Sequence, residues 1–192
     1  MKIKIATRKS ELALFQANYV AEKLNQLEGI TTELVPLLSE GDQTDKPLHE
    51  IGGKGLFVNK LESALILGDA DIAVHSLKDV PAILDSKFKI ASIFQRGSAS
   101  DILLSREGWS LDTLPINSVI GTSSPRRKSQ ILNSRSDLKT IPVRGNIATR
   151  IEKLNLGTFD GLIVAKAALN RLNLQLPNAY AVSYTHLRAH ET

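Results

Sequence analysis

The sequence contains no cysteine among its 192 residues. This absence excludes disulfide bonds, thiolate metal sites and cysteine nucleophiles within the polypeptide. A chain without thiols is compatible with a reducing compartment, and we expect a cytoplasmic protein.

Long apolar runs and aromatic residues are also scarce. No apolar stretch approaches the ~18 residues that indicate a membrane span. The N-terminal stretch MKIKIATRKSELALF lacks the continuous apolar segment of a secretory signal. Aromatic residues make up 5% of the chain and do not interleave with its basic residues, which disfavours nucleic-acid binding. We expect a soluble monomer with neither a membrane nor a nucleic-acid partner.

Positive charge is concentrated in one segment. The whole chain has 24 basic and 20 acidic residues, a formal net charge of +4. Gly121 to Lys153 hold eight basic and two acidic residues, a balance of +6, so the remainder carries −2. This concentration indicates an anionic partner, with a solvated surface as the alternative.

The pattern of apolar residues predicts an α/β fold of two doubly wound domains around a cleft. Strands and helices alternate in a βαβαβ order, which is typical of a parallel sheet covered by helices. We expect domain one at residues 1–96 and domain two at 97–182. The expected strands are 3–6, 31–38, 70–77, 89–95, 101–105, 118–124 and 138–145. The expected helices begin near Glu11, Leu56, Pro125 and Ile147, and 159–172 is a strand leading into a helix.

Polar clusters follow four of the expected strands. They are TRKS (7–10), HSLKD (75–79), GTSSPRR (121–127) and RGN (144–146). Ligands of open α/β sheets bind outside the carboxyl ends of the strands. The four clusters therefore predict a site in a cleft between the domains.

The sequence GTSSPRR predicts an anion site at the start of a helix. Backbone N–H groups and the hydroxyls of Thr122, Ser123 and Ser124 can hold an anion there, helped by the helix dipole. Arg126 and Arg127 add guanidinium groups suited to carboxylate or phosphate. Helix capping by serine is the alternative, and the pattern of a P-loop is absent.

Three weaker signals accompany this turn. VRGNIATR places Arg144 at a strand end, Gly145 at a turn, Asn146 as a helix cap and Arg150 on the helix. Arg8 and Ser10 follow the first strand, and Lys54 lies between glycines, where a flexible turn is the alternative.

The sequence HSLKDVP places one carboxylate among these basic residues. Strand alternation would put His75, Leu77 and Asp79 on one side, and Ser76 and Lys78 on the other. Asp79 is the only acid in the polar clusters, and nearby cations should keep it ionised, so that it can stabilise a developing cation or move a proton. The alternatives are a solvent-exposed Lys78–Asp79 pair and a structural role for His75. No paired His/Asp spacing predicts a metal site.

Together these motifs resemble the porphobilinogen deaminase (hydroxymethylbilane synthase) family. The matching segments lie in order over about residues 3 to 180: IATRKSELALFQA, ELVPLLSEGD, IGGKGLFVNKLESAL, ADIAVHSLKDVP, IGTSSPRRKSQ, VRGNIATRIEKL and FDGLIVAKAALNRL. The resemblance implies a transferase of haem biosynthesis that joins four porphobilinogen units and releases ammonia at each addition. It also implies a type II periplasmic-binding-protein-like architecture and a dipyrromethane cofactor held by a cysteine.

The resemblance also implies roles for particular residues. Asp79 corresponds to the catalytic carboxylate, which steadies the pyrrole nitrogens and the cationic azafulvene formed as ammonia leaves. Residues at the family's cofactor positions are Ser76, Lys78, Asp79, Thr122, Ser124, Arg126, Arg127, Arg144 and Gly145. Residues at positions that handle substrate carboxylates are Arg8, Ser10, Arg144, Arg150 and Arg171, and Lys54 and Phe57 lie on the loop that folds over the cleft.

The chain departs from the family pattern in three ways. Asn59-Lys60 stands where the family usually has Lys-Glu, and no cysteine is present to anchor the cofactor. The returning segment of domain one and a third domain are missing from the pattern. SYTHLRAHET (183–192) is unlike a family continuation, and we interpret it as a read-through artefact. We expect a fragment that is inactive by itself.

Two other classes of protein are compatible with the motifs. Two α/β units around an anion-binding cleft also describe small-anion solute-binding proteins and ligand-sensing modules, although fold analogy does not settle function. Such a binder would release its ligand unchanged, whereas the enzyme would liberate ammonia. A nucleic-acid-binding protein would instead show steep salt dependence of DNA binding.

Overall fold

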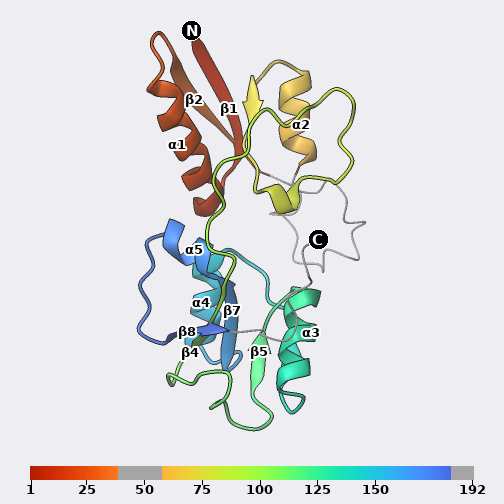
Figure 1. The fold of residues 1–192 in the computed structure, drawn as a ribbon, viewed down its shortest axis with the longest axis vertical. Helices are drawn as coiled ribbons and strands as arrows, with labels where there is room; N and C mark the ends of the chain where they lie inside the picture. The colour runs from red at the N-terminus through yellow and green to blue at the C-terminus, as the bar shows by residue number, and fades with distance from the viewer. Residues whose placement is uncertain (39–57, 183–192) are drawn as a thin grey trace. The chain divides into compact units, whose positions relative to one another are not determined.

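The chain folds as two units, Met1–Phe94 and Gln95–Thr192, and the predicted junction lies two residues further along. The computed structural model describes residues 1–38 and 58–182. Figure 1 labels most of the helices and strands of both units. None of the helices in the described ranges is long and apolar enough to cross a membrane.

Unit 1 is built on a parallel sheet of order β2-β1-β3. Its elements are β1 (Lys2–Arg8), α1 (Glu11–Asn25), β2 (Thr31–Leu37), α2 (Asn59–Ile66), β3 (Ile72–Ala73) and a 3₁₀ turn (Leu77–Asp79). Ile5 packs against α1 and its neighbour Ala6 packs against α2. Because successive strand residues point to opposite faces, the two helices cover opposite faces of the sheet.

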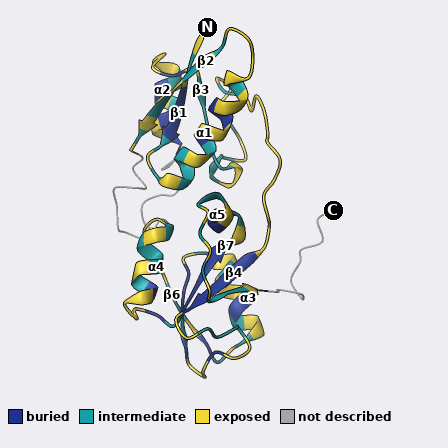
Figure 2. Ribbon diagram, turned by 90° about the vertical axis from the view of Figure 1, so that its left-hand side faces the viewer, coloured by how far each residue is buried: buried dark blue, intermediate teal, exposed yellow. Residues whose placement is uncertain are grey.

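The described part of unit 2 is built on a five-stranded mixed sheet of order β6-β5-β7-β4-β8. Its elements are β4 (Asp101–Ser105), β5 (Val119–Gly121), α3 (Pro125–Ser134), β6 (Lys139–Ile141), α4 (Ile147–Asn155), β7 (Gly161–Ala165), α5 (Lys166–Arg171) and β8 (Ala179–Val182). Leu103 lies in a core with α3, and Leu104 lies in a second core with α4 and α5. The strands β4 and β7 are the buried centre of this unit (Figure 2).

Several predicted elements are confirmed by the structure. Ser10, Ser124 and Asn146 cap α1, α3 and α4, and each side-chain oxygen accepts a hydrogen bond from a backbone N–H of the first turn. Pro36 lies in β2, an edge strand of its sheet, where a missing N–H is tolerated. The prediction of doubly wound α/β units is confirmed, since helices cover both faces of each sheet.

The expected strands at 70–77 and 89–95 are wrong in extent or absent. β3 covers only Ile72–Ala73, after which the chain turns toward α1 and forms the 3₁₀ turn. Residues 89–95 form no strand, and the whole run from 89 to 100 is exposed. An alternating pattern forms a strand only where a partner strand takes up its backbone hydrogen bonds.

Two features of unit 2 were not predicted. β8 was missed, and β4 runs antiparallel to both β7 and β8, whereas the sequence pattern indicated parallel strands. The strands expected at 118–124 and 138–145 are shorter, because their polar ends form turns ahead of α3 and α4. In unit 1, the helix expected to begin at residue 56 corresponds to α2, which covers Asn59–Ile66 in the described residues.

Candidate functional site

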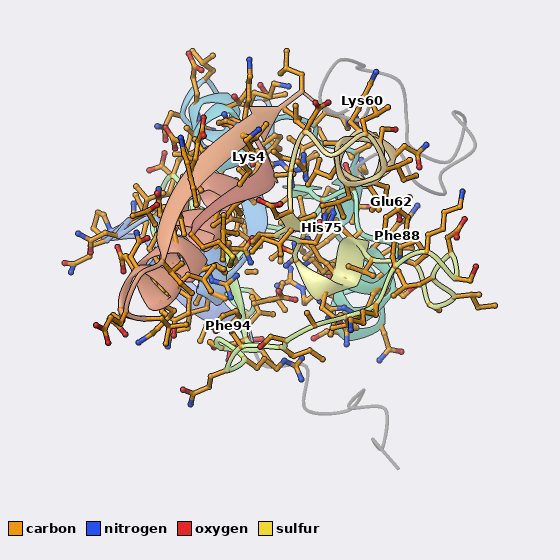
Figure 3. All side chains as sticks on the ribbon, turned by 90° about the horizontal axis from the view of Figure 1, so that it is seen from above. Lys4, Lys60, Glu62, His75, Phe88 and Phe94 are labelled. Carbon is orange, nitrogen blue, oxygen red and sulfur yellow. The ribbon has the colours of Figure 1, made fainter. Side chains whose placement is uncertain are left out.

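The polar edge of unit 1 brings together Arg8, His75 and Asp79. Arg8 ends β1, and His75 follows β3, which is parallel to β1, so both lie beyond the carboxyl ends of neighbouring strands. Burial lowers the pKa of the His75 imidazole, while the Asp79 carboxylate raises this pKa and the Arg8 guanidinium lowers it. His75 is labelled in Figure 3. The His75 imidazole therefore interacts with one anionic group, Asp79, and one cationic group, Arg8. Burial keeps the imidazole neutral near pH 7.

The 3₁₀ turn changes the predicted grouping of this segment. His75, Leu77 and Asp79 do not share one side of a strand, because Leu77–Asp79 is a turn of helix. Lys78 is exposed and Asp79 is half-buried. Asp79 is thus presented by a turn that follows a sheet strand, close enough to His75 to influence its charge.

The hydroxyls of unit 1 are engaged within the protein. Ser10 Oγ accepts a hydrogen bond from the Ala13 N–H at 3.4 Å, as a helix cap. Ser76 Oγ donates to Oε1 of Gln16 on α1 at 2.9 Å. Both residues therefore fix the backbone that carries Arg8 and Asp79, and their contacts with ligands stay predictions.

The first turn of unit 2 runs from β5 into α3. Thr122 is buried, and its Oγ1 accepts from the Ser124 N–H at 3.3 Å. Ser124 Oγ accepts from the Arg127 N–H at 3.4 Å and caps α3. The capping alternative for Ser124 is therefore confirmed, and α3 presents its positive end of the helix dipole here.

Ser123 joins this turn to the turn that precedes α4. Its Oγ donates to the Val143 carbonyl at 2.7 Å, and the Val143 N–H donates back to Oγ at 2.9 Å. One hydroxyl thus replaces a pair of ladder hydrogen bonds between two segments. The two polar turns are held at a fixed separation.

The second turn places Arg144, Gly145 and Asn146 between β6 and α4. Gly145 has φ +107°, a conformation that residues with side chains rarely adopt. Asn146 Oδ1 accepts from the Thr149 N–H at 2.9 Å and caps α4. Arg150 Nε donates to the Gly145 carbonyl at 2.8 Å, so the guanidinium is held against the turn.

Three arginines of unit 2 lie within electrostatic range of one another. Burial lowers the pKa of the Arg150 guanidinium, and the positive charges of Arg127 and Arg144 lower it further. Guanidinium groups that are partly removed from water repel one another, and a bound anion offsets this repulsion. We call Arg127, Arg144 and Arg150 the arginine cluster, and its chemistry is that of an anion site.

An acid that the sequence analysis missed lies against this cluster. Asp101 is only 4% exposed, and its carboxylate pairs with Arg126 at 2.9 Å and with Arg127 at 2.6 Å. The prediction that Asp79 is the only acid among the basic groups is therefore wrong. Asp101 lies at the beginning of its strand, whereas parallel strands would place ligand-binding groups only where strands end.

The remaining predicted residues lie elsewhere or outside the described residues. Arg171 ends α5, where its Nη2 would stand 3.5 Å from a Cβ placed on Gly97. Lys54 and Phe57 lie outside the described residues. In the described ranges, no group of three or more His, Cys, Asp and Glu residues is arranged to hold a metal ion.

Residues 3–189 match the family model described as "Porphobilinogen deaminase, dipyromethane cofactor binding domain". The chain belongs to the porphobilinogen deaminase family. A porphobilinogen deaminase of Xanthomonas axonopodis pv. citri is 47% identical over 175 residues, which cover 90% of this chain and 58% of the relative. One from Maridesulfovibrio salexigens is 48% identical over 180 residues, covering 93% of this chain and 58% of the relative. The chain thus spans somewhat over half the length of these porphobilinogen deaminases.

Solved structures support the fold assignment alone. The periplasmic VFT2 domain of BvgS from Bordetella pertussis has a TM-score of 0.50 at 14% identity, covering 94% of this chain and 75% of that one. A probable amino-acid ABC transporter extracellular-binding protein of Bacillus subtilis has a TM-score of 0.50 at 11% identity, covering 95% and 78%. The fold is therefore periplasmic-binding-protein-like, as expected for a porphobilinogen deaminase.

The residues of unit 2 fit the carboxylate groups of the cofactor that the family model names. Arg127 Nε is buried and has no hydrogen-bond partner among the described residues, so the protein leaves a donor of this guanidinium unsatisfied. The residues present do not fit covalent attachment of this cofactor through a cysteine, because the 192 residues include no thiol. The unsatisfied donor of Arg127 is thus suited to a carboxylate of a dipyrromethane, while the 192 residues supply no thiol for its attachment.

Proposed function

We propose that this chain carries the cofactor- and substrate-binding units of a hydroxymethylbilane synthase, a transferase of haem biosynthesis that joins four porphobilinogen units with release of ammonia. Family membership over residues 3–189 is the observation that carries the proposal. The structure supports it through two kinds of site chemistry, a carboxylate in unit 1 and the arginine cluster in unit 2. We also propose that the protein is a cytoplasmic monomer that binds neither nucleic acid nor membranes.

Asp79 is the proposed catalytic residue. A half-buried carboxylate can accept hydrogen bonds from pyrrole N–H groups and stabilise positive charge that develops on the substrate as ammonia departs. Arg8 and Asp79 both lie close enough to His75 to shift the pKa of its imidazole. The Arg8 guanidinium can therefore bind a substrate carboxylate near Asp79. This pairing of opposite charges suits a substrate that carries acid groups and forms a cation.

The arginines of unit 2 are proposed to bind the acetate and propionate groups of pyrroles. Arg126 and Arg127 project from the first turn of α3, and Arg144 and Arg150 flank Gly145. Planar guanidinium groups recognise carboxylates through paired hydrogen bonds, and burial strengthens the attraction. Thr122, Ser124 and Gly145 shape the two turns, while Lys78, Ser10 and Arg171 are proposed as further contacts. The dipyrromethane, when bound, supplies the pyrrole on which the product chain grows.

The small-anion binding alternative is not favoured. Its support would come from fold likeness at 14% identity or lower, which carries no ligand from one protein to another. Asp79 also has no evident purpose in a protein that only binds anions.

A chimeric enzyme tests the proposal. The 175-residue aligned segment of the Xanthomonas axonopodis relative is replaced by the matching segment of this chain, and ammonia and hydroxymethylbilane are measured with porphobilinogen as substrate. We expect turnover by the chimera. A folded, cofactor-loaded chimera that leaves porphobilinogen unchanged would contradict the proposed function.

The 192-residue polypeptide is assayed by itself alongside the chimera. We expect it to bind porphobilinogen without producing hydroxymethylbilane, because no cysteine in it can hold the cofactor. Steady hydroxymethylbilane production by this polypeptide would show that the expectation of inactivity is wrong.

A further inference from the structure

Asp101 reaches the ligand edge of unit 2 because its strand runs in the opposite direction to its neighbours. β5 and β7 are parallel, so the turn 121–124 lies at their carboxyl edge. β4 is antiparallel to β7, and its first residue Asp101 pairs with Ala165, the last residue of β7. The beginning of β4 therefore lies at the same edge as the anion turn. The buried carboxylate is placed by the sheet itself.

The Asp101 carboxylate is shared between two arginines of α3. Oδ2 accepts from Arg126 Nη2 at 2.9 Å, and Oδ1 accepts from Arg127 Nη2 at 2.6 Å. Each guanidinium has a second contact: Arg126 Nη1 donates to Gln130 Oε1 at 2.6 Å, and Arg127 Nη1 donates to the Ile163 carbonyl at 3.3 Å. Two contacts on different nitrogens fix the plane of a guanidinium as well as its position.

Both guanidiniums keep hydrogen-bond donors beyond these contacts. An arginine has five N–H donors, and the contacts with described residues use two of the five on Arg127. The Arg126 side chain is 57% exposed, whereas that of Arg127 is 16% exposed. One arginine of the pair thus meets solvent while the other is mostly enclosed, and a single carboxylate aligns them both.

We propose that Asp101 is a positioning residue for carboxylate recognition, which holds the Arg126 and Arg127 guanidiniums in the orientation that receives the acid groups of a pyrrole ligand. This inference rests on the proposed function for the identity of the ligand. Asp101 itself makes no contact with the ligand's acid groups, because two anionic groups would repel each other.

For Asp101→Asn, the proposal predicts a change in ligand affinity that is opposite in sign to the change expected from net charge. Replacing Asp101 by asparagine adds one positive charge beside an anion site, which by Coulomb attraction alone would tighten anion binding. Loss of orientation would weaken binding, because the amide N–H₂ faces one guanidinium with a donor where an acceptor is needed. The direction of the change therefore separates positioning from simple charge balance.

The experiment measures porphobilinogen affinity of the 192-residue chain by calorimetry, for the native protein, Asp101→Asn and Asp137→Asn. Asp137 is the matched control, since it also pairs with an arginine of unit 2, Arg135, at 2.6 Å and its replacement changes the charge equally. We expect affinity to fall about tenfold or more in Asp101→Asn, and to change by less than about twofold in Asp137→Asn. Native or tighter affinity in folded Asp101→Asn would overturn the proposal.

A second variant and a ligand-independent measurement complete the test. Asp101→Glu keeps the charge and displaces the carboxylate by one methylene, so positioning predicts weaker binding and charge balance predicts native binding. In the native chain, NMR should show distinct, slowly exchanging Nη signals for Arg127, and a freely rotating guanidinium there would also overturn the proposal. If the native chain does not bind porphobilinogen, the proposed function fails, while loss of the distinct Arg127 signals in Asp101→Asn still decides whether Asp101 orients the arginine.

Discussion

The side chain of Thr149 occupies the space that a side chain on Gly145 would need. A Cβ at position 145 would stand 2.8 Å from Thr149 Cγ2 and 2.9 Å from Thr149 Cβ. Thr149 cannot move away easily, because its N–H and its Oγ1 both donate to Asn146 Oδ1. The glycine is therefore required for its backbone angle and for the close approach of α4.

We predict that Gly145→Ala lowers the free energy of unfolding by about 1–3 kcal/mol, from the positive φ, with a further loss from the clash. Chemical denaturation monitored in unit 2 measures this loss. Gly108→Ala is the control, because Gly108 also has a positive φ of 75° but its nearest Cβ contact is an ordinary 3.4 Å. Equal losses in the two variants would show that Thr149 does not restrict position 145.

Ser123→Ala should uncouple the polar turn ahead of α3 from the polar turn ahead of α4. The change removes both hydrogen bonds between Ser123 Oγ and the backbone of buried Val143, and we expect a loss of about 1–3 kcal/mol in the free energy of unfolding. Ser129→Ala on the exposed face of α3 serves as the control and should be neutral or slightly stabilising. Native stability in Ser123→Ala would mean that the bridge between the turns contributes nothing.

The charge on His75 should respond in opposite directions to its two charged neighbours. Asp79→Asn removes the carboxylate that favours the imidazolium, so the pKa of His75 should fall further. Arg8→Gln removes a repelling cation, so this pKa should rise. NMR titration of the His75 ring measures both changes, with Lys9→Gln as a control that leaves the pKa unaltered. Shifts of the same sign in the two variants would contradict the arrangement.

The same histidine makes stability depend on pH. Its pKa is lower in the folded state than the unfolded value of about 6.5, so the unfolded chain binds more protons in that range. The stability that comes from a neutral His75 is therefore present above about pH 6.5 and is lost as the pH falls from there through the folded pKa. His75→Gln should lose less stability than the native chain between pH 7 and pH 5, as chemical denaturation at the two pH values would show.

Asp79→Ala should nearly abolish turnover in the chimeric enzyme while cofactor loading persists. Loss of a carboxylate that stabilises charge or moves a proton in the reaction typically costs about 10²–10⁴-fold in rate. The matched control is Asp85→Ala, an exposed acid of the same unit whose Oδ1 accepts a hydrogen bond from the Lys87 N–H. Turnover comparable to that of the Asp85 variant would remove Asp79 from the proposed role.

Much of the fold was predictable because local chemistry specified it. Ser10, Ser124 and Asn146 each precede a helix that begins where the cap requires, and Pro125 stands in the first turn of α3. Parallel pairing of β1 with β2 and β3 followed from the alternation of strands and helices. Arg127, Arg144 and Arg150 were expected together because each follows or flanks a parallel strand end.

The missed features depend on pairing between distant segments. Nothing in the local sequence of Asp101 indicates that β4 runs against β7, and with that direction unknown the acid could not be placed at the ligand edge. β8 was missed for a similar reason, since its four residues become a strand only by pairing with β4. The segment 89–95 shows the converse, because its apolar alternation lacks a partner strand among the described residues.

The reversed direction of β4 also has a consequence for the order in which the molecule can fold during synthesis. β4 is the first strand of unit 2 to leave the ribosome, yet its partners in the sheet are β7 and β8, the last two strands among the described residues of the unit. Pairings between segments far apart in sequence form late, because the intervening loop must close before they are rewarded. Arg126 and Arg127 therefore emerge well before the strand that carries Asp101 is secured. We expect the nascent chain to acquire its ordered anion site only after Val182 has been synthesised.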